Sequence, residues 1–125
     1  MIIAVDFDGT CVTHEYPEIG RDIGAQPVLK EMVAKGHQLI LWTMRDGICL
    51  AQALDWFKRN DIPLGSVNEN PNQVVWTDSP KAYAQLYIDD AAYGAPLIEG
   101  LAGERPHFDW SKVVNDPTFY EQSKT

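Results

Sequence analysis

Mostly apolar runs alternate with amphipathic segments along much of the chain. Residues 2–7, 38–43 and 86–88 are dominated by apolar side chains, which predicts three buried strands. Residues 26–35, and the stretch from Asp46 to about residue 60, carry apolar side chains at helical spacing and predict two helices. Strands that alternate with helices in this way are typical of an α/β fold with a parallel sheet.

The stretch after the second predicted helix has many turn-forming residues and little of the apolar periodicity of a helix or strand. Residues 61–73 are rich in turn-forming side chains, and residues 74–76 are expected to form a short strand. A brief helix is predicted to begin at Ser79 and Pro80, with serine as N-cap and proline at the first helical position. No repeat or linker divides the chain, so residues 1–125 are interpreted as one domain.

Composition narrows the class of protein. There are 18 acidic and 10 basic side chains, for a net charge of −8 at pH 7, and 45% of residues are hydrophobic. A folded core is expected, whereas duplex nucleic acid and anionic membranes, which attract basic surfaces, are not expected partners. No apolar run approaches the roughly 18 residues of a membrane span. With no recognised signal peptide and only two cysteines, we expect a cytoplasmic protein, and a homo-oligomer stays open.

Polar side chains follow each of the three predicted strands. Asp6 and Asp8 end the first, Thr43 ends the second, and Asp89 and Asp90 end the third. The carboxyl edge of a parallel sheet is where ligands bind, so these groups are expected to meet there. Asp6 and Asp8 are two residues apart and would point the same way on a continuing strand. Carboxylate oxygens suit Mg²⁺, so the sequence predicts a metal site at this edge.

Lys81 adds a cation to this set of oxygens. In the predicted helix it takes the second position, directly after Pro80. A cation there opposes the helix dipole, at a cost of roughly 0.3–1 kcal/mol. A bound anion would offset that cost, so we interpret Lys81 as a phosphate ligand beside the metal site.

The ordered set of these residues resembles a known family. Asp-Phe-Asp-Gly-Thr at residues 6–10 resembles the first motif of the haloacid dehalogenase superfamily of phosphotransferases. Thr43, Lys81 and the pair at residues 89–90 resemble its second, third and fourth motifs, in the same order. Residues 42–45, followed by a helix in so short a chain, are similar to small capless phosphatase-like members. The resemblance implies a three-layer Rossmann-like parallel sheet with no cap domain and an open site.

The resemblance also implies a reaction. Asp6 would be the nucleophile that forms an aspartyl-phosphate, and Asp8 the general acid and then the base for the hydrolytic water. Thr43 and the backbone amide of Met44 would hold the phosphate oxygens, and Lys81 would neutralise the nucleophile and the transferring phosphoryl group.

Metal binding and the neighbouring arginine complete the implied site. Mg²⁺ would be held by the Asp6 carboxylate, the Asp8 backbone carbonyl and Asp89, with Asp90 as a further ligand or acting through water. Arg45 is interpreted either as a substrate contact or as a surface ion-pair partner of Asp46. The histidines show no metal-binding spacing, so core or solvent positions are expected for His14, His37 and His107.

These features favour a Mg²⁺-dependent phosphatase acting on a nucleotide, a phosphosugar or another small phosphorylated metabolite. The alternative is a catalytically weak, receiver-like or haloacid dehalogenase-like module that binds phosphate and metal and acts through a protein partner. The receiver pattern places its lysine after the other motifs, whereas Lys81 here precedes the pair at residues 89–90.

Overall fold

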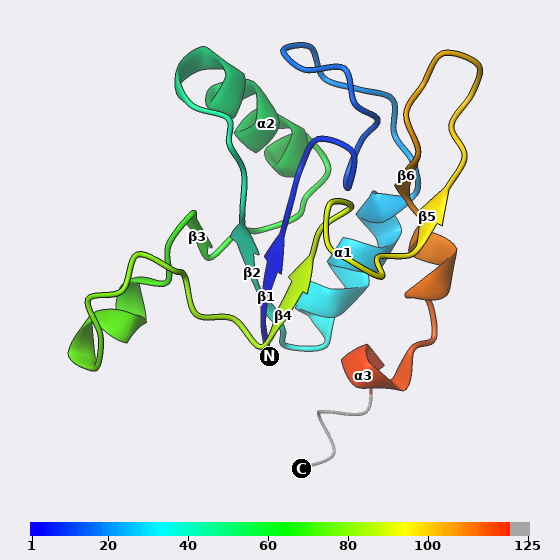
Figure 1. Cartoon of the computed structure of the whole chain (residues 1–125). Coiled ribbons are helices and arrows are strands. Elements are labelled where there is room, and N and C mark those ends of the chain that lie inside the picture. The colour runs from blue at the N-terminus through cyan, green and yellow to red at the C-terminus, as the bar shows by residue number, and fades with distance from the viewer. Residues whose placement is uncertain (121–125) are drawn as a thin grey trace.

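Four parallel strands form the central sheet of the computed structural model, which describes residues 1–120 (Figure 1). Their order is β3-β2-β1-β4, so the N-terminal strand lies inside the sheet. In register, Val5 of β1 lies opposite Leu41 of β2 and Ile88 of β4. The bounds are Ile2–Val5 for β1, Gln38–Leu41 for β2, Ser66–Val67 for β3 and Leu86–Ile88 for β4. The α/β class and the three predicted strands are confirmed, whereas β3 lies in a stretch where only turns were predicted.

Helices connect the strands, and the two long ones match the sequence prediction. These are α1 (Ala25–Ala34) and α2 (Gly47–Arg59). Later elements are short: the 3₁₀ helices η1 (Pro71–Val75) and η2 (Trp110–Lys112), the antiparallel pair β5 (Leu97–Ile98) and β6 (His107–Phe108), and α3 (Pro117–Tyr120). No helix within residues 1–120 combines the length and the apolar character needed to cross a membrane.

The hydrophobic core lies on one face of the sheet. Side chains alternate between the faces of a strand, and alternate residues of β1 and β2 point into one cluster with α1, α2 and the C-terminal elements. Phe7 sits at its centre, with its ring centroid 5.6 Å from that of Trp56 and 5.9 Å from that of Phe57. Trp110 anchors the C-terminal segment to the first loop, because its indole N–H donates to the Thr10 carbonyl at 2.7 Å.

The opposite face of the sheet has no α-helix within the described residues, so the predicted third layer of helices is not formed. The chain between β3 and β4 contains only η1 as a helix. A strand over residues 74–76 and a helix from Ser79 were both wrong predictions. Asn70 caps η1 by accepting from the Asn72 amide, and the 3₁₀ turn takes up most of the predicted strand.

Gln73 explains why no helix follows η1. Its buried side-chain amide donates to the carbonyls of Ser79 and Lys81, and its side-chain oxygen accepts from the Tyr83 amide at 2.7 Å. One side chain thereby satisfies the backbone groups that a helix would have paired with one another. The segment is held in an irregular conformation by a partner that local sequence signals do not reveal.

Candidate active site

Three carboxylates meet where β1 and β4 end. The Asp6 amide donates to the Ile88 carbonyl at 2.9 Å, which extends the pairing of these strands by one residue. Asp89 and Asp90 follow β4 directly, so the parallel register brings them beside Asp6. One oxygen from each of the three carboxyl groups lies within 4.8 Å of the others. The predicted meeting of these residues at the carboxyl edge of the sheet is confirmed.

Thr10 ties this cluster together. Its hydroxyl oxygen lies 2.9 Å from Asp6 Oδ2 and 3.0 Å from Asp90 Oδ1, and it accepts from the Asp90 amide at 2.9 Å. A hydroxyl carries a single proton, so it donates to one of these carboxylates at a time. Thr10 is fully buried, so it fixes the spacing between the two carboxyl groups. The sequence places Thr10 at the end of the motif at residues 6–10, which was the signal that it belongs to the site.

Electrostatics make the Asp6 carboxyl hard to ionise. Burial is the largest cause, and together with the charge of Asp89 and a hydrogen bond with Asp90 it raises the pKa of Asp6 from 3.8 to about 8. Neighbouring negative charges in a poorly solvated place favour either a proton or a cation between them. The donor set consists of hard carboxylate oxygens, so the three residues fit a divalent ion such as Mg²⁺.

His14 is a site residue that sequence reasoning missed. Its Nε2 lies 2.7 Å from Asp90 Oδ2, across 76 residues of chain. Gly9 makes this approach possible, because a Cβ there would lie 2.0 Å from His14 Nε2, and its φ of +83° also suits glycine. The only sequence signal was the position of His14 just after the acidic motif.

Asp8 does not point toward the carboxylate cluster, as the expected strand continuation would require. The chain turns after Asp6, with the Phe7 carbonyl accepting from the Cys11 amide at 2.8 Å. The two Asp8 oxygens instead accept from Arg45, with Nε–Oδ2 at 2.8 Å and Nη2–Oδ1 at 2.7 Å. This bidentate pairing is a strong, directional form of charge-assisted hydrogen bond.

Arg45 lies in the loop between β2 and α2, and its side chain is buried against the loop that follows β1. It is 2% exposed, and its guanidinium also donates to the carbonyls of Pro17, Glu18 and Cys49. Its pKa is raised by the hydrogen bonds to Asp8. The structure therefore does not place Arg45 where a substrate would meet it, and its carboxylate partner is Asp8 instead of Asp46.

A cavity of about 380 Å³ opens beside the carboxylate cluster. Its lining includes Asp6, Asp89, Thr43 and Met44, so these predicted residues share one space. Asn68, which follows β3, also lines it and was not predicted. The Asn68 side chain accepts from the Thr43 amide at 2.8 Å and donates to the Thr43 carbonyl at 2.9 Å. This pairing fixes the backbone of the loop between β2 and α2.

Lys81 is not at a helix N-terminus. Its Nζ lies over the ring of Tyr87, 5.5 Å from the centroid, on a segment without regular structure. Within residues 1–120 it makes no ion pair, and it is not among the residues that line the cavity beside Asp6. The helix-dipole argument for a phosphate at Lys81 therefore does not hold.

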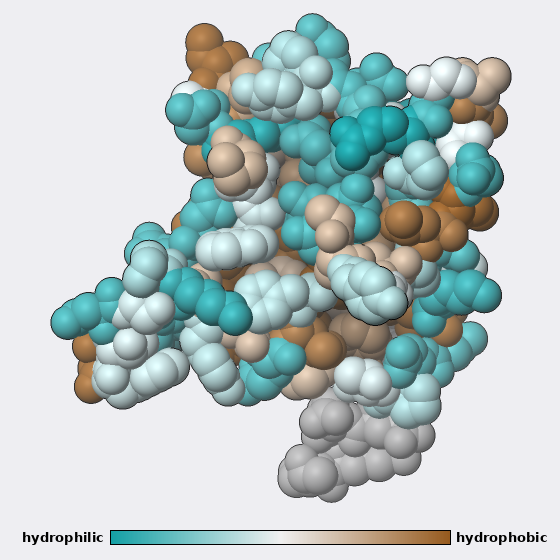
Figure 2. Space-filling model, in the orientation of Figure 1, coloured by the Kyte–Doolittle hydropathy of each residue, from teal (hydrophilic) through white to brown (hydrophobic). Residues whose placement is uncertain are grey.

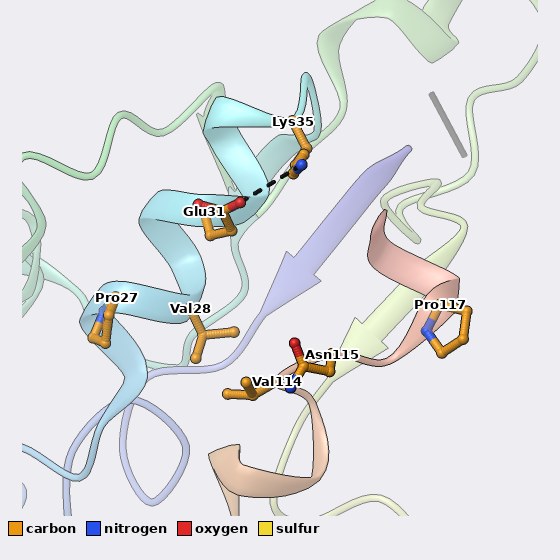
Figure 3. Close-up of a pocket in the computed structure, with 7 residues that line it drawn as sticks. All are labelled: Pro27, Val28, Glu31, Lys35, Val114, Asn115 and Pro117. Carbon is orange, nitrogen blue, oxygen red and sulfur yellow. Dashed lines mark ion pairs between the residues drawn. The ribbon is translucent and has the colours of Figure 1, made fainter. Parts of the chain in front are cut away.

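A larger cleft lies elsewhere, between α1 and the C-terminal segment (Figure 3). Its volume is about 570 Å³, and it contains none of the three clustered carboxylates. The charged pair on its wall, Glu31 and Lys35, is joined at 3.8 Å. The lining residues are Pro27, Val28, Glu31, Lys35, Val114, Asn115 and Pro117. Asp6 and Asp89 of the carboxylate cluster thus line the smaller cavity and not this cleft.

Comparison with known proteins places the chain beside one solved structure. It matches a conserved protein coded by a locus of Bacteroides thetaiotaomicron with 34% sequence identity and a TM-score of 0.71, over 95% of each chain. Identity and coverage of this size show that the chain belongs to the same family as that protein. No family model and no curated protein matches the sequence.

Proposed function

We propose that the protein is a Mg²⁺-dependent phosphatase of the haloacid dehalogenase type, acting through an aspartyl-phosphate on Asp6. One observation carries the proposal: a half-buried Asp6 shares a sheet edge with Asp89 and Asp90, and its pKa is raised to about 8. Carboxylates forced together in this way favour a bound cation. The order of the sequence motifs supports the same conclusion.

The metal would be held by Asp6, Asp89 and Asp90. A bound Mg²⁺ supplies charge neutralisation and polarises phosphoryl oxygens. The protein provides the carboxylates and their fixed spacing, since Thr10 bonds to both Asp6 and Asp90.

Asp6 is then positioned to act as a nucleophile. Thr10 engages Oδ2 of Asp6, which leaves Oδ1 to attack the phosphorus of a phosphomonoester. The new Oδ1–P bond would form as the P–O bond to the leaving group breaks, and the leaving oxygen would take the proton of Asp8. Water would then attack the phosphorus and lose a proton to Asp8 as the Oδ1–P bond breaks, which releases inorganic phosphate and regenerates both side chains. Thr43 and Met44 line the same cavity and would hold the phosphate oxygens.

The pairing of Asp8 with Arg45 favours a second candidate function. Both oxygens of Asp8 accept from the buried arginine, so a carboxylic proton for the leaving group requires the pair with Arg45 to open. A module that binds phosphate and metal but turns over slowly fits this arrangement. The two candidates share the carboxylate cluster and differ in whether Asp8 supplies a proton.

Hydrolysis of p-nitrophenyl phosphate tests the proposal. Activity is expected with Mg²⁺, and it should disappear with EDTA. Asp6→Asn should lower kcat by several orders of magnitude, because the nucleophile is lost. Asp55→Asn is the matched control, since Asp55 is an exposed carboxylate paired with Arg59. Activity of Asp6→Asn within tenfold of the wild type would refute the nucleophile assignment. Phosphate and metal binding without turnover would favour the second candidate.

A further inference from the structure

A group of exposed aromatic side chains surrounds a small pocket on the face of the sheet that lacks an α-helix. Trp76, Tyr83 and Tyr87 line it, together with Lys81, and its volume is about 260 Å³. The rings of Trp76 and Tyr83 stand edge to face with centroids 5.6 Å apart. Trp76 is 62% exposed and Tyr83 43%, so both rings are accessible to a ligand. In Figure 2, surface of intermediate hydropathy extends from the arm that carries η1 toward the centre of the sheet.

This pocket adjoins the carboxylate cluster. Tyr87 of β4 lies opposite Ala4 of β1. Asp6 comes two residues after Ala4, and Asp89 comes two residues after Tyr87. Side chains two residues apart share a face at a spacing of about 6.6 Å, so Tyr87, Asp6 and Asp89 lie on one face. Trp42 bridges the two spaces, because it lines the cavity beside Asp6 and its ring centroid lies 6.4 Å from that of Tyr87.

The size and chemistry of the pocket indicate what it would take. Pockets for drug-sized ligands are larger, at about 300–1,000 Å³, so this one suits a single ring system. Aromatic rings bind planar aromatic groups by stacking and edge-to-face contact. Lys81 leaves a positive charge at the wall, over Tyr87, where it can face electronegative ring atoms.

We propose that this aromatic pocket binds the base of a nucleoside monophosphate whose phosphate lies at Asp6. The inference rests on the proposed phosphatase function and specifies its substrate class. A sugar between the base and the phosphate spans the step from the aromatic pocket to the carboxylate cluster. An unsubstituted sugar phosphate would reach Asp6 but leave the aromatic rings uncovered.

Steady-state kinetics with a matched pair of substrates test the inference. Adenosine 5′-monophosphate and ribose 5-phosphate share the phosphate and the sugar and differ in the base. The wild type should show a lower KM for the nucleotide. In Trp76→Ala that KM should rise roughly 5- to 100-fold with kcat retained, because a stacking ring contributes equally to the bound substrate and the transition state. The KM for ribose 5-phosphate should be unchanged.

Two further variants test the second aromatic ring and provide a control. Tyr83→Ala should reproduce the effect of Trp76→Ala through the other ring of the pair. Val75→Ala removes an exposed apolar side chain from the same 3₁₀ helix and should leave both KM values unchanged. Equal KM values for the two substrates in the wild type, or a nucleotide KM insensitive to both aromatic variants, would overturn the pocket assignment while leaving a phosphatase intact.

Equilibrium binding separates this inference from the proposed function. Asp6→Asn and the double variant Asp6→Asn/Trp76→Ala are titrated with adenosine 5′-monophosphate in isothermal titration calorimetry. The double variant should bind roughly 5- to 100-fold more weakly. This result would support the pocket even if the wild type hydrolysed no phosphomonoester, in which case only the phosphatase proposal fails. Equal affinities, or no binding to either protein, would overturn the aromatic pocket as the base site.

Discussion

The titration of Asp6 gives a direct test of the electrostatics in the carboxylate cluster. Its pKa is about 8 in the folded protein, against an ordinary value of 3.8. Between these two pH values the folded state binds the extra proton, so the metal-free protein should lose stability as the pH rises. The largest slope for one proton is about 1.4 kcal/mol per pH unit. From pH 5 to pH 8 the loss attributable to Asp6 is therefore at most about 4 kcal/mol.

Urea unfolding in EDTA at several pH values measures this effect. Asp6→Asn carries no titrating group at this position, so its unfolding free energy should fall less between pH 5 and pH 8 than that of the wild type. The two proteins share every other titratable group, so the difference between the two curves reports on Asp6. Asp89→Asn should flatten the wild-type curve in part, because the charge of Asp89 is the second cause of the raised pKa. Asp55→Asn should not change it.

Mg²⁺ should offset much of the loss of stability at pH 8. A cation that binds only the folded protein at a hundredfold its Kd adds about 2.7 kcal/mol to the unfolding free energy. Parallel pH curves for the wild type and Asp6→Asn in EDTA would refute the electrostatic reasoning. So would the same gain from Mg²⁺ in both proteins, since Asp6 would then contribute nothing to the metal site.

Three further outcomes are expected at the neighbouring residues. Arg45→Met should lower the unfolding free energy by about 3–5 kcal/mol in urea denaturation, because it leaves the Asp8 carboxylate without its buried partner; a loss under 1 kcal/mol would contradict this. Asp8→Asn should slow hydrolysis of alkyl phosphates more than that of p-nitrophenyl phosphate, which needs little acid assistance; equal losses would remove Asp8 from the acid role. Lys81→Ala should change the unfolding free energy in urea denaturation by no more than about 0.5 kcal/mol, because Lys81 is exposed and has no ion pair within residues 1–120. A larger loss would reveal a structural role for Lys81.

The sequence by itself determined three of the four strands of the sheet and the meeting of Asp6 with Asp89 and Asp90. Apolar runs specify buried strands, and parallel strands place their carboxyl ends at one edge of the sheet whatever the conformation of the loops between them. The helices α1 and α2 follow from their apolar spacing in the same way. These features depend on local periodicity and on a topology with few alternatives, so reading along the chain was enough.

Only the tertiary structure decided which partner each polar side chain takes. Asp8 pairs with Arg45 across 37 residues, and Asp90 meets His14 across 76. Gln73 satisfies backbone groups that the sequence would have assigned to a helix after Pro80. Periodicity reports which face of an element is buried, whereas hydrogen bonds between distant segments depend on how the loops close. The position of Asp6 beside Asp89 and Asp90 was therefore predictable from the sequence, but the residues that Asp8 and Lys81 contact were not.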